Sequence, residues 1–197
     1  MKVLHINGNY ISTTLHQTMM NHLCLTGIES KVFVPTYDRS KSVIIPNKNV
    51  LIAECFRKWD RIAFDYKQAK IIVAAQKAYD MSTFDCIHAY TLFTDGNCAM
   101  KLAGKYGIPY FVTVRNTDVN TFFKKIIFLR TRGIQILQNA SAVFFLSEAY
   151  RRQVFKKYVP LRLHDSLLRK TYIIPNGIDD FWLDNRVATI DPAHINR

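Results

Sequence analysis

Glycine and proline are scarce in this 197-residue sequence, which contains 7 glycines and 6 prolines. Linker-like and disordered chains are usually rich in such residues and poor in apolar ones, whereas 49% of this chain is hydrophobic. The composition therefore excludes disorder as the main state. The length is enough for one domain with a sizeable core and too short for two domains of full size.

Long hydrophobic runs are also missing. No stretch reaches the roughly 18 apolar residues that a membrane-spanning helix needs. The apolar run at residues 2–6 is too short for a secretory signal peptide, and polar residues at 7–9 end it. The four cysteines form no C-x-x-C pair, which favours reduced thiols over disulfides or a metal site. We expect a cytoplasmic protein.

Several motifs of catalysis and cofactor binding are absent. His16 and His22 lie six residues apart, which does not place them on one helical face, and no H-E-x-x-H occurs. The sequence has neither the G-x-S-x-G elbow that carries the nucleophilic serine of α/β-hydrolases nor the G-x-G-x-x-G loop of dinucleotide-binding domains. We therefore expect no metal and no bound cofactor.

Acidic residues are few, and the cations are concentrated. The chain has 27 lysines and arginines against 15 acidic residues, a formal net charge of +12. Residues 115–172 hold 12 of these cations and 3 acidic residues, so this segment alone carries +9. Such an excess favours an anionic partner, which could be nucleic acid, a membrane surface or a phosphorylated ligand.

Short apolar runs alternate with helical patterns along the whole chain. We expect strands at 2–6, 31–34, 43–45, 86–89, 110–114, 142–146 and 172–174. We expect helices at 12–25, 56–79, 97–106 and 122–138, and one after Ser147. The second helix is predicted from the helical spacing of Phe56, Trp59, Ala63 and Tyr66. This alternation predicts an α/β fold, a three-layer α/β/α Rossmann-like domain with a mainly parallel sheet.

Small, polar and charged residues follow the expected strands. Sheets of this kind bind ligands in the crevice beyond the carboxyl ends of their strands, so we expect the site there. In the first of these loops Gly8 would let a diphosphate approach the backbone and Ser12 could cap the next helix, although a plain turn is equally consistent. After the fifth strand, Arg115 could pair with a phosphate or carboxylate, or form an ion pair with Asp118 that only fixes the loop.

The expected helix at 122–138 carries a cationic face. Lys124 and Phe128 share this face, with Lys125 and Arg132 beside it. An aromatic residue among cations is typical of a membrane interface, and we predict that these four residues face an anionic membrane. The alternative is a solvated helix with Phe128 at the rim of the core.

Four segments together resemble the N-terminal domain of family 4 retaining glycosyltransferases. Residues 172–179 (YIIPNGID) resemble the I-P-N-G-[VI]-D signature that closes this domain. Residues 84–89 (FDCIHA), 105–113 (KYGIPYFVT) and 140–147 (ASAVFFLS) are similar to three other segments of the family, in the same order. The resemblance is tight from 84 to 179 and loose before about residue 79.

The resemblance implies a GT-B architecture, in which two Rossmann-like domains enclose the active site. Residues 1–180 would then be the acceptor-binding domain and 181–197 the start of the interdomain linker. The C-terminal domain, which in the family holds most of the nucleotide-sugar donor, would lie outside this chain. We therefore expect this chain alone to be inactive and to bind a nucleotide-sugar weakly. Its acceptor would be a sugar or a lipid-linked molecule, in the synthesis of a surface polysaccharide or lipid-linked glycan, at the inner face of the membrane.

The resemblance also implies a set of site residues. The family's H-G-x-D segment stands here as residues 115–118, so Arg115 replaces the histidine. This suits retaining transfer in which the leaving diphosphate accepts the acceptor's proton and Arg115 supplies positive charge, with no metal. The implied catalytic residues are Arg115 and Asp118. The implied cleft residues are Asn7, Gly8, Asn9, Asp95, Gly96, Asn116, Ser147, Glu148, Asn176 and Gly177.

Two other functions remain open. The basic segment also suits a nucleic-acid-binding module, but the expected sheet faces are buried and offer no exposed aromatic platform. A Rossmann-type oxidoreductase or nucleotide-sugar epimerase would share the fold, but the missing G-x-G-x-x-G loop opposes it.

Overall fold

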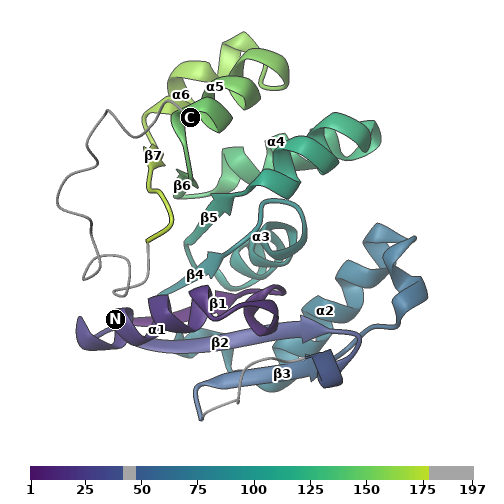
Figure 1. Ribbon diagram of the computed structural model, residues 1–197, viewed down its shortest axis with the longest axis vertical. Coiled ribbons are helices and arrows are strands. Elements are labelled where there is room, and N and C mark those ends of the chain that lie inside the picture. The colour runs from purple at the N-terminus through teal and green to yellow at the C-terminus, as the bar shows by residue number, and fades with distance from the viewer. Residues whose placement is uncertain (42–47, 178–197) are drawn as a thin grey trace, which may run out of the picture.

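A seven-stranded parallel sheet forms the centre of the molecule (Figure 1). The computed structural model describes residues 1–41 and 48–177. Along the sheet the strands follow the order β3-β2-β1-β4-β5-β6-β7, and every neighbouring pair is parallel. The strands are β1 (Lys2–Ile6), β2 (Glu29–Thr36), β3 (Val50–Glu54), β4 (Cys86–Ala89), β5 (Tyr110–Val114), β6 (Ala142–Phe145) and β7 (Thr171–Ile173).

Helices cover both faces of this sheet, which confirms the predicted α/β/α layers. The α-helices are α1 (Leu15–Leu25), α2 (Phe64–Ala78), α3 (Thr94–Tyr106), α4 (Arg130–Asn139), α5 (Glu148–Lys157) and α6 (His164–Leu168). Side chains alternate between the two faces along each strand. One set, such as Leu4, Ile87 and Val112, forms the main core with α2 to α5. The other set includes Val32 and Val34, which form a smaller core with α1.

The expected strands agree with the structure except at the third position. The predicted strand at 43–45 lies outside the described residues. The third strand of the structure, β3, was not predicted, although its sequence VLIAE is apolar. It is an edge strand, and Ile52 is its one buried residue. A short, half-exposed run of this kind has no periodicity that separates a strand from a loop.

The predicted helix at 56–79 begins later than expected, at Phe64. A short 3-10 helix, Lys58–Arg61, precedes it, and the Arg57 backbone N–H donates to Asp60 Oδ2 at 2.7 Å. This contact caps the start of the short turn. The predicted apolar stripe is wrong, because two of its residues are largely exposed. Trp59 is 76% exposed and Tyr66 58% exposed.

The predicted helix at 122–138 is wrong as a continuous element. It is divided into a π-helical segment (Asp118–Phe123), a 3-10 turn (Ile127–Leu129) and α4. At the break the Arg130 guanidinium donates to the Phe123 carbonyl at 2.7 Å, which satisfies an acceptor that a regular helix would pair internally. Because of the break, Lys124 and Phe128 do not lie on one α-helical face with the residues of α4.

Candidate functional site

The carboxyl ends of all seven strands meet at one edge of the sheet, because every pair is parallel. The expected site loops therefore lie at this edge: residues 7–9 after β1, 115–118 after β5, 147–148 after β6 and 176–177 after β7. The edge is divided by the sheet into two separate cavities, one on the face that carries α1 and one beside the N-termini of α2 and α3.

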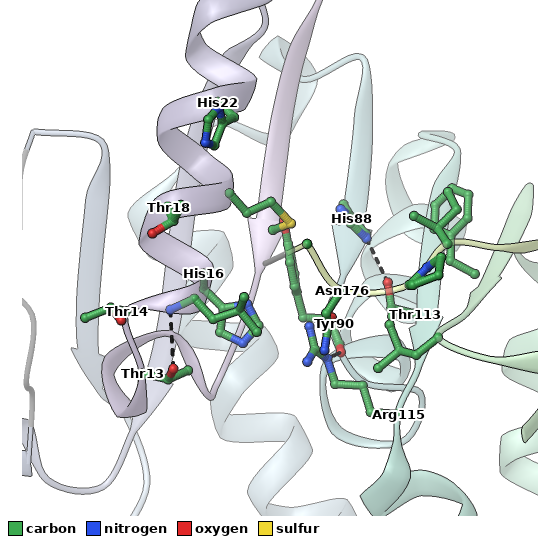
Figure 2. A pocket seen from close by; sticks show the side chains of 17 residues that line it. Thr13, Thr14, His16, Thr18, His22, His88, Tyr90, Thr113, Arg115 and Asn176 are labelled. Carbon is green, nitrogen blue, oxygen red and sulfur yellow. Dashed lines mark hydrogen bonds between the residues drawn. The ribbon is translucent and has the colours of Figure 1, made fainter. Parts of the chain in front are cut away.

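We call the first the Arg115 cavity. It has a volume of about 440 Å³ and lies between α1 and the exposed face of β4, β5 and β6 (Figure 2). Arg115 and Asn176 line its end at the sheet edge, and His88 and Thr113 line its floor. The Arg115 side chain is oriented by its Nε–H, which donates to the Tyr90 carbonyl at 2.8 Å. Within residues 1–41 and 48–177 no carboxylate forms an ion pair with its terminal guanidinium nitrogens, so they can receive an anion.

Three neutral histidines surround the ring of Tyr90, the residue whose carbonyl binds Arg115. His5 bonds to Ser30 Oγ at 3.2 Å and to the Tyr90 hydroxyl at 3.1 Å, and His88 bonds to Thr113 Oγ1 at 3.1 Å. Burial lowers the pKa of His5 and of His16 to about 4, and the charge of Arg115 adds to the effect at His16. Burial lowers the pKa of His88 to about 3, with smaller contributions from His5, Arg115 and His16. At neutral pH His16 and His88 therefore add no positive charge to that of Arg115.

Asp118 holds the backbone of this edge together. Its side chain is buried, and Oδ2 accepts N–H groups of Leu92 and Arg115 at 3.0 and 2.9 Å while Oδ1 accepts that of Phe93 at 3.2 Å. Burial raises the pKa of Asp118 to about 6, against the effect of these three bonds. A carboxylate engaged in this way orders the loop after β5, and these contacts favour a structural over a catalytic role. The bond to Arg115 comes from the Arg115 backbone, so the side-chain ion pair considered above does not form.

We call the second the Asp95 cavity. It has a volume of about 490 Å³ and is lined by the loop after β1, the N-terminal turns of α2 and α3 and the segment at 117–129. Asp95, in the first turn of α3, is 2% exposed, and its Oδ1 accepts the Gly8 N–H at 3.3 Å. Burial raises the pKa of Asp95 to about 7, and the nearby Asp118 contributes in the same direction. Lys67 of α2 lines the same cavity.

The remaining predicted cleft residues are divided between the two cavities and the protein interior. Gly8 and Asn9 line the Asp95 cavity, and Asn176 and Gly177 line the Arg115 cavity. The others line neither cavity: Asn7, Gly96, Asn116, Ser147 and Glu148.

Two of these five residues, Gly96 and Ser147, have a role in packing or helix capping. A Cβ on Gly96 would come within 3.0 to 3.1 Å of Ile136, Thr91 and Val112, so this glycine allows α3 to pack closely on the sheet. Ser147 caps α5 by accepting the Tyr150 N–H at 3.3 Å.

The side chains of Glu148, Asn116 and Asn7 form polar contacts within the protein. Glu148 pairs with Arg151 and Arg152, and the side chain of Asn116 bonds to Asn120. Asn7 is buried, and its Oδ1 accepts the Asn9 N–H at 3.1 Å.

Ser12 does not cap α1, because it belongs to a preceding 3-10 turn (Tyr10–Ser12). Instead, the N–H of Leu15 donates to Thr13 Oγ1 at 3.3 Å. Sequence reasoning also missed Lys67, since a lysine on an amphipathic helix normally faces solvent. The expected start of this helix at residue 56 concealed that Lys67 lies in the first turn of α2, which begins at Phe64.

The four residues predicted to face a membrane have different surroundings. Lys124 and Lys125 are exposed, and Phe128 is 78% exposed. The guanidinium of Arg132 is engaged within the fold, because it donates to Asn97 at 2.7 Å and to Asp65 at 3.3 Å. These contacts hold it between α2, α3 and α4.

Within 1–41 and 48–177, no three His, Cys, Asp or Glu side chains are grouped as metal ligands would be. The helices in the same ranges are too short or too polar to cross a bilayer.

Comparisons with known proteins agree with this architecture. The family model described as Glycosyltransferase Family 4 matches residues 14–180. No curated protein matches the chain in sequence. Sucrose-phosphate synthase from Thermosynechococcus elongatus is similar in structure with a TM-score of 0.62 at 13% identity, over 93% of this chain and 94% of that one.

Two larger proteins share the fold over about half of their length. UGT89C1 of Arabidopsis thaliana, in complex with UDP, has a TM-score of 0.55 at 12% identity, over 95% of this chain and 55% of that one. UDP-GlcNAc 2-epimerase from Methanocaldococcus jannaschii has a TM-score of 0.58 at 13% identity, over 89% of this chain and 46% of that one. Since the family model spans most of its length, the chain belongs to glycosyltransferase family 4 and has the Rossmann-like fold of one half of a GT-B enzyme.

Proposed function

We propose that this chain is the acceptor-binding N-terminal domain of a nucleotide-sugar-dependent retaining glycosyltransferase. The observation that carries this proposal is the position of Arg115, which lies at the carboxyl edge of a family 4 domain with its terminal nitrogens available at the end of a cavity. Residues 1–180 form the acceptor domain, 181–197 begin the linker, and a second domain supplies most donor contacts. The epimerases share the fold, but the family match favours transfer.

Arg115 has one electrostatic task in this proposal. As the bond between sugar and diphosphate breaks, negative charge grows on the leaving diphosphate, and a fixed guanidinium stabilises it. The diphosphate then accepts the proton of the attacking hydroxyl, so the reaction needs no imidazole base. The neutral histidines are consistent with this, because their lowered pKa values leave Arg115 as the cation.

Calorimetry tests where the donor binds. We expect uridine and guanosine diphosphate sugars to bind this chain more weakly than the micromolar range, because in this proposal a second domain makes most of the donor contacts. The same diphosphates should shift backbone NMR signals of residues around the Arg115 cavity in wild type. An Arg115→Met variant should abolish these shifts. Micromolar binding by this chain, or shifts that Arg115→Met leaves unchanged, would contradict the proposed division between acceptor and donor domains.

We further propose that the enzyme works at the inner face of an anionic membrane, on a lipid-linked acceptor of a surface glycan. Eight exposed residues from two segments form what we call the docking rim: Arg57, Lys58, Trp59, Ile62, Lys124, Lys125, Ile127 and Phe128. The rings of Phe64 and Phe122, 6.5 Å apart, connect the two segments. Ile62 and Phe128, 84% and 78% exposed, also line the Asp95 cavity.

Charge supports an anionic surface as the partner of this rim. The two acidic residues nearby are already engaged, Asp60 with Lys70 at 2.6 Å and Asp65 with Arg132 at 3.3 Å. The rim therefore presents unneutralised cations beside exposed apolar side chains, which is the composition of interfacial membrane-binding surfaces. Each cation close to such a surface contributes about 1 kcal/mol.

Cosedimentation with vesicles tests the rim. We expect wild type to prefer anionic over neutral vesicles, with binding that weakens in salt. The double variant Lys124→Glu, Lys125→Glu should lose at least about tenfold in affinity, because four units of charge change at the surface. The matched control is Lys156→Glu, Lys157→Glu, which makes the same charge change on exposed residues of α5.

Equal losses in both double variants would mean that net charge alone, and no particular surface, drives binding. Nucleic acid is included as a competitor, since it satisfies the same charge. A preference of wild type for nucleic acid at physiological salt would replace the membrane by a nucleic-acid partner.

A further inference from the structure

The Asp95 cavity is lined by a buried acidic side chain, Asp95, and a half-buried basic one, Lys67, that do not bond to each other. Asp95 Oδ2 is buried and has no hydrogen-bond partner among the described residues. The Lys67 ammonium lies 5.1 Å from the centre of the Phe56 ring. Among the described residues no ion pair joins Lys67 to Asp95. The two groups nevertheless interact through space, since each shifts the pKa of the other.

An unbridged pair of this kind is unfavourable. A buried polar atom without a partner loses its hydration and gains no hydrogen bond, which destabilises the folded chain. A hydroxyl group can serve both charges, because it donates to a carboxylate and accepts from an ammonium. Two adjacent hydroxyls on one ring would provide one group for each charge, with a small shift of the Asp95 side chain to bring its buried Oδ2 within reach.

The walls of the cavity suit the ring that would carry these hydroxyls. Phe56, Phe64 and Phe122 line it, and Thr91 and Thr94 add two hydroxyl groups that bond to each other at 2.7 Å. Aromatic walls with a few convergent polar groups are usual in small-molecule sites, and a volume of about 490 Å³ is within their range.

We propose that this cavity binds a neutral polyhydroxylated ring, a pyranose or a cyclitol, with two adjacent hydroxyls bridging the Asp95 carboxyl and the Lys67 ammonium. The proposal rests on the proposed function, in that this ring would be the head group of the acceptor. A phosphorylated ring fits less well, because Asp95 would face the added negative charge. Arg61, exposed at the mouth with its guanidinium 5.8 Å from the Tyr37 ring, is the one cation lining this cavity besides Lys67 in the described residues.

Ligand titrations of the full chain followed by methyl NMR test the proposal. The probes are myo-inositol and the methyl glycosides of glucose, galactose and mannose, with cyclohexanol as a ring of one hydroxyl and glucose 6-phosphate as the anionic probe. We expect at least one neutral polyol to bind in the millimolar range and to shift the methyl signals of Ile62 and Ile71, which line the cavity. Cyclohexanol should bind more weakly.

Variants connect binding to the two charges. Asp95→Asn and Lys67→Met should each raise the dissociation constant of that polyol by about fivefold or more, because each replaces a charge-assisted hydrogen bond by a neutral one or by none. The matched controls are Asp165→Asn and Lys77→Met, which make the same changes at exposed positions. Thermal melting confirms that each variant is folded.

Three results would overturn the proposal: no polyol binds, the controls lose as much affinity as the cavity variants, or glucose 6-phosphate binds more tightly than the neutral rings. The proposed function fails separately. If polyols bind as expected but diphosphates show no dependence on Arg115, the transferase assignment is wrong and the ring site stands. If diphosphates depend on Arg115 but no polyol does on Asp95, the ring site alone is wrong.

Discussion

Replacing Asp118 by alanine is expected to lower the free energy of unfolding by about 3 to 5 kcal/mol, one of the largest effects in this protein. The carboxylate accepts the backbone N–H groups of Leu92, Phe93 and Arg115, and all three bonds lie in the interior or at its edge. Alanine leaves these donors without a partner, and water has little access to them. Urea unfolding followed by circular dichroism measures the change.

Asp80→Ala is the matched control for this measurement. Asp80 also accepts a backbone N–H, that of Ser82, but at an exposed position, so we expect a loss of about 1 kcal/mol or less. If Asp118→Ala unfolds at the same urea concentration as Asp80→Ala, the carboxylate does not hold the loop. A catalytic role for Asp118 would then be favoured again.

Asp95→Asn is expected to stabilise the protein relative to wild type, and more so at high pH. Burial raises the pKa of Asp95 to about 7 in the folded state, whereas an unfolded aspartate titrates near 3.9. Above pH 4 the unfolded chain therefore releases this proton before the folded chain does, and wild type loses stability as the pH rises through about 7. Asparagine stays neutral. From pH 5 to pH 8 its advantage should grow by on the order of 2 kcal/mol.

Urea unfolding of both proteins at several pH values gives this difference. The three buried histidines make the protein less stable as the pH falls from about 6.5 towards 4, because their lowered pKa values mean that the unfolded chain takes up these protons first. The same histidines are present in both proteins, so this effect cancels in the comparison. Asp165→Asn, at an exposed position, should show no such trend. A pH-independent difference between Asp95→Asn and wild type would mean that Asp95 is not held in its neutral form by burial.

Local sequence patterns were sufficient for most of the fold. The expected strands at 2–6, 86–89 and 110–114 coincide with β1, β4 and β5, because each is a short apolar run bounded by polar loops. The edge strand β3 and the interrupted helix before α4 were missed. Their boundaries depend on contacts such as the bond from Arg130 to the Phe123 carbonyl, which no local pattern encodes.

The site was less predictable, since its chemistry depends on partners far apart in the chain. The sequence by itself determined the parallel α/β fold, the family, and the edge of the sheet at which the polar loops gather. The tertiary structure alone decided that Arg132 is engaged with Asn97, that Asp118 binds backbone, and that Lys67 lies in the same cavity as Asp95. Gly8 and Asp95, which bond across this cavity, are 87 residues apart. Burial and neighbouring charge set the ionisation of such groups, and both arise only when the chain has folded.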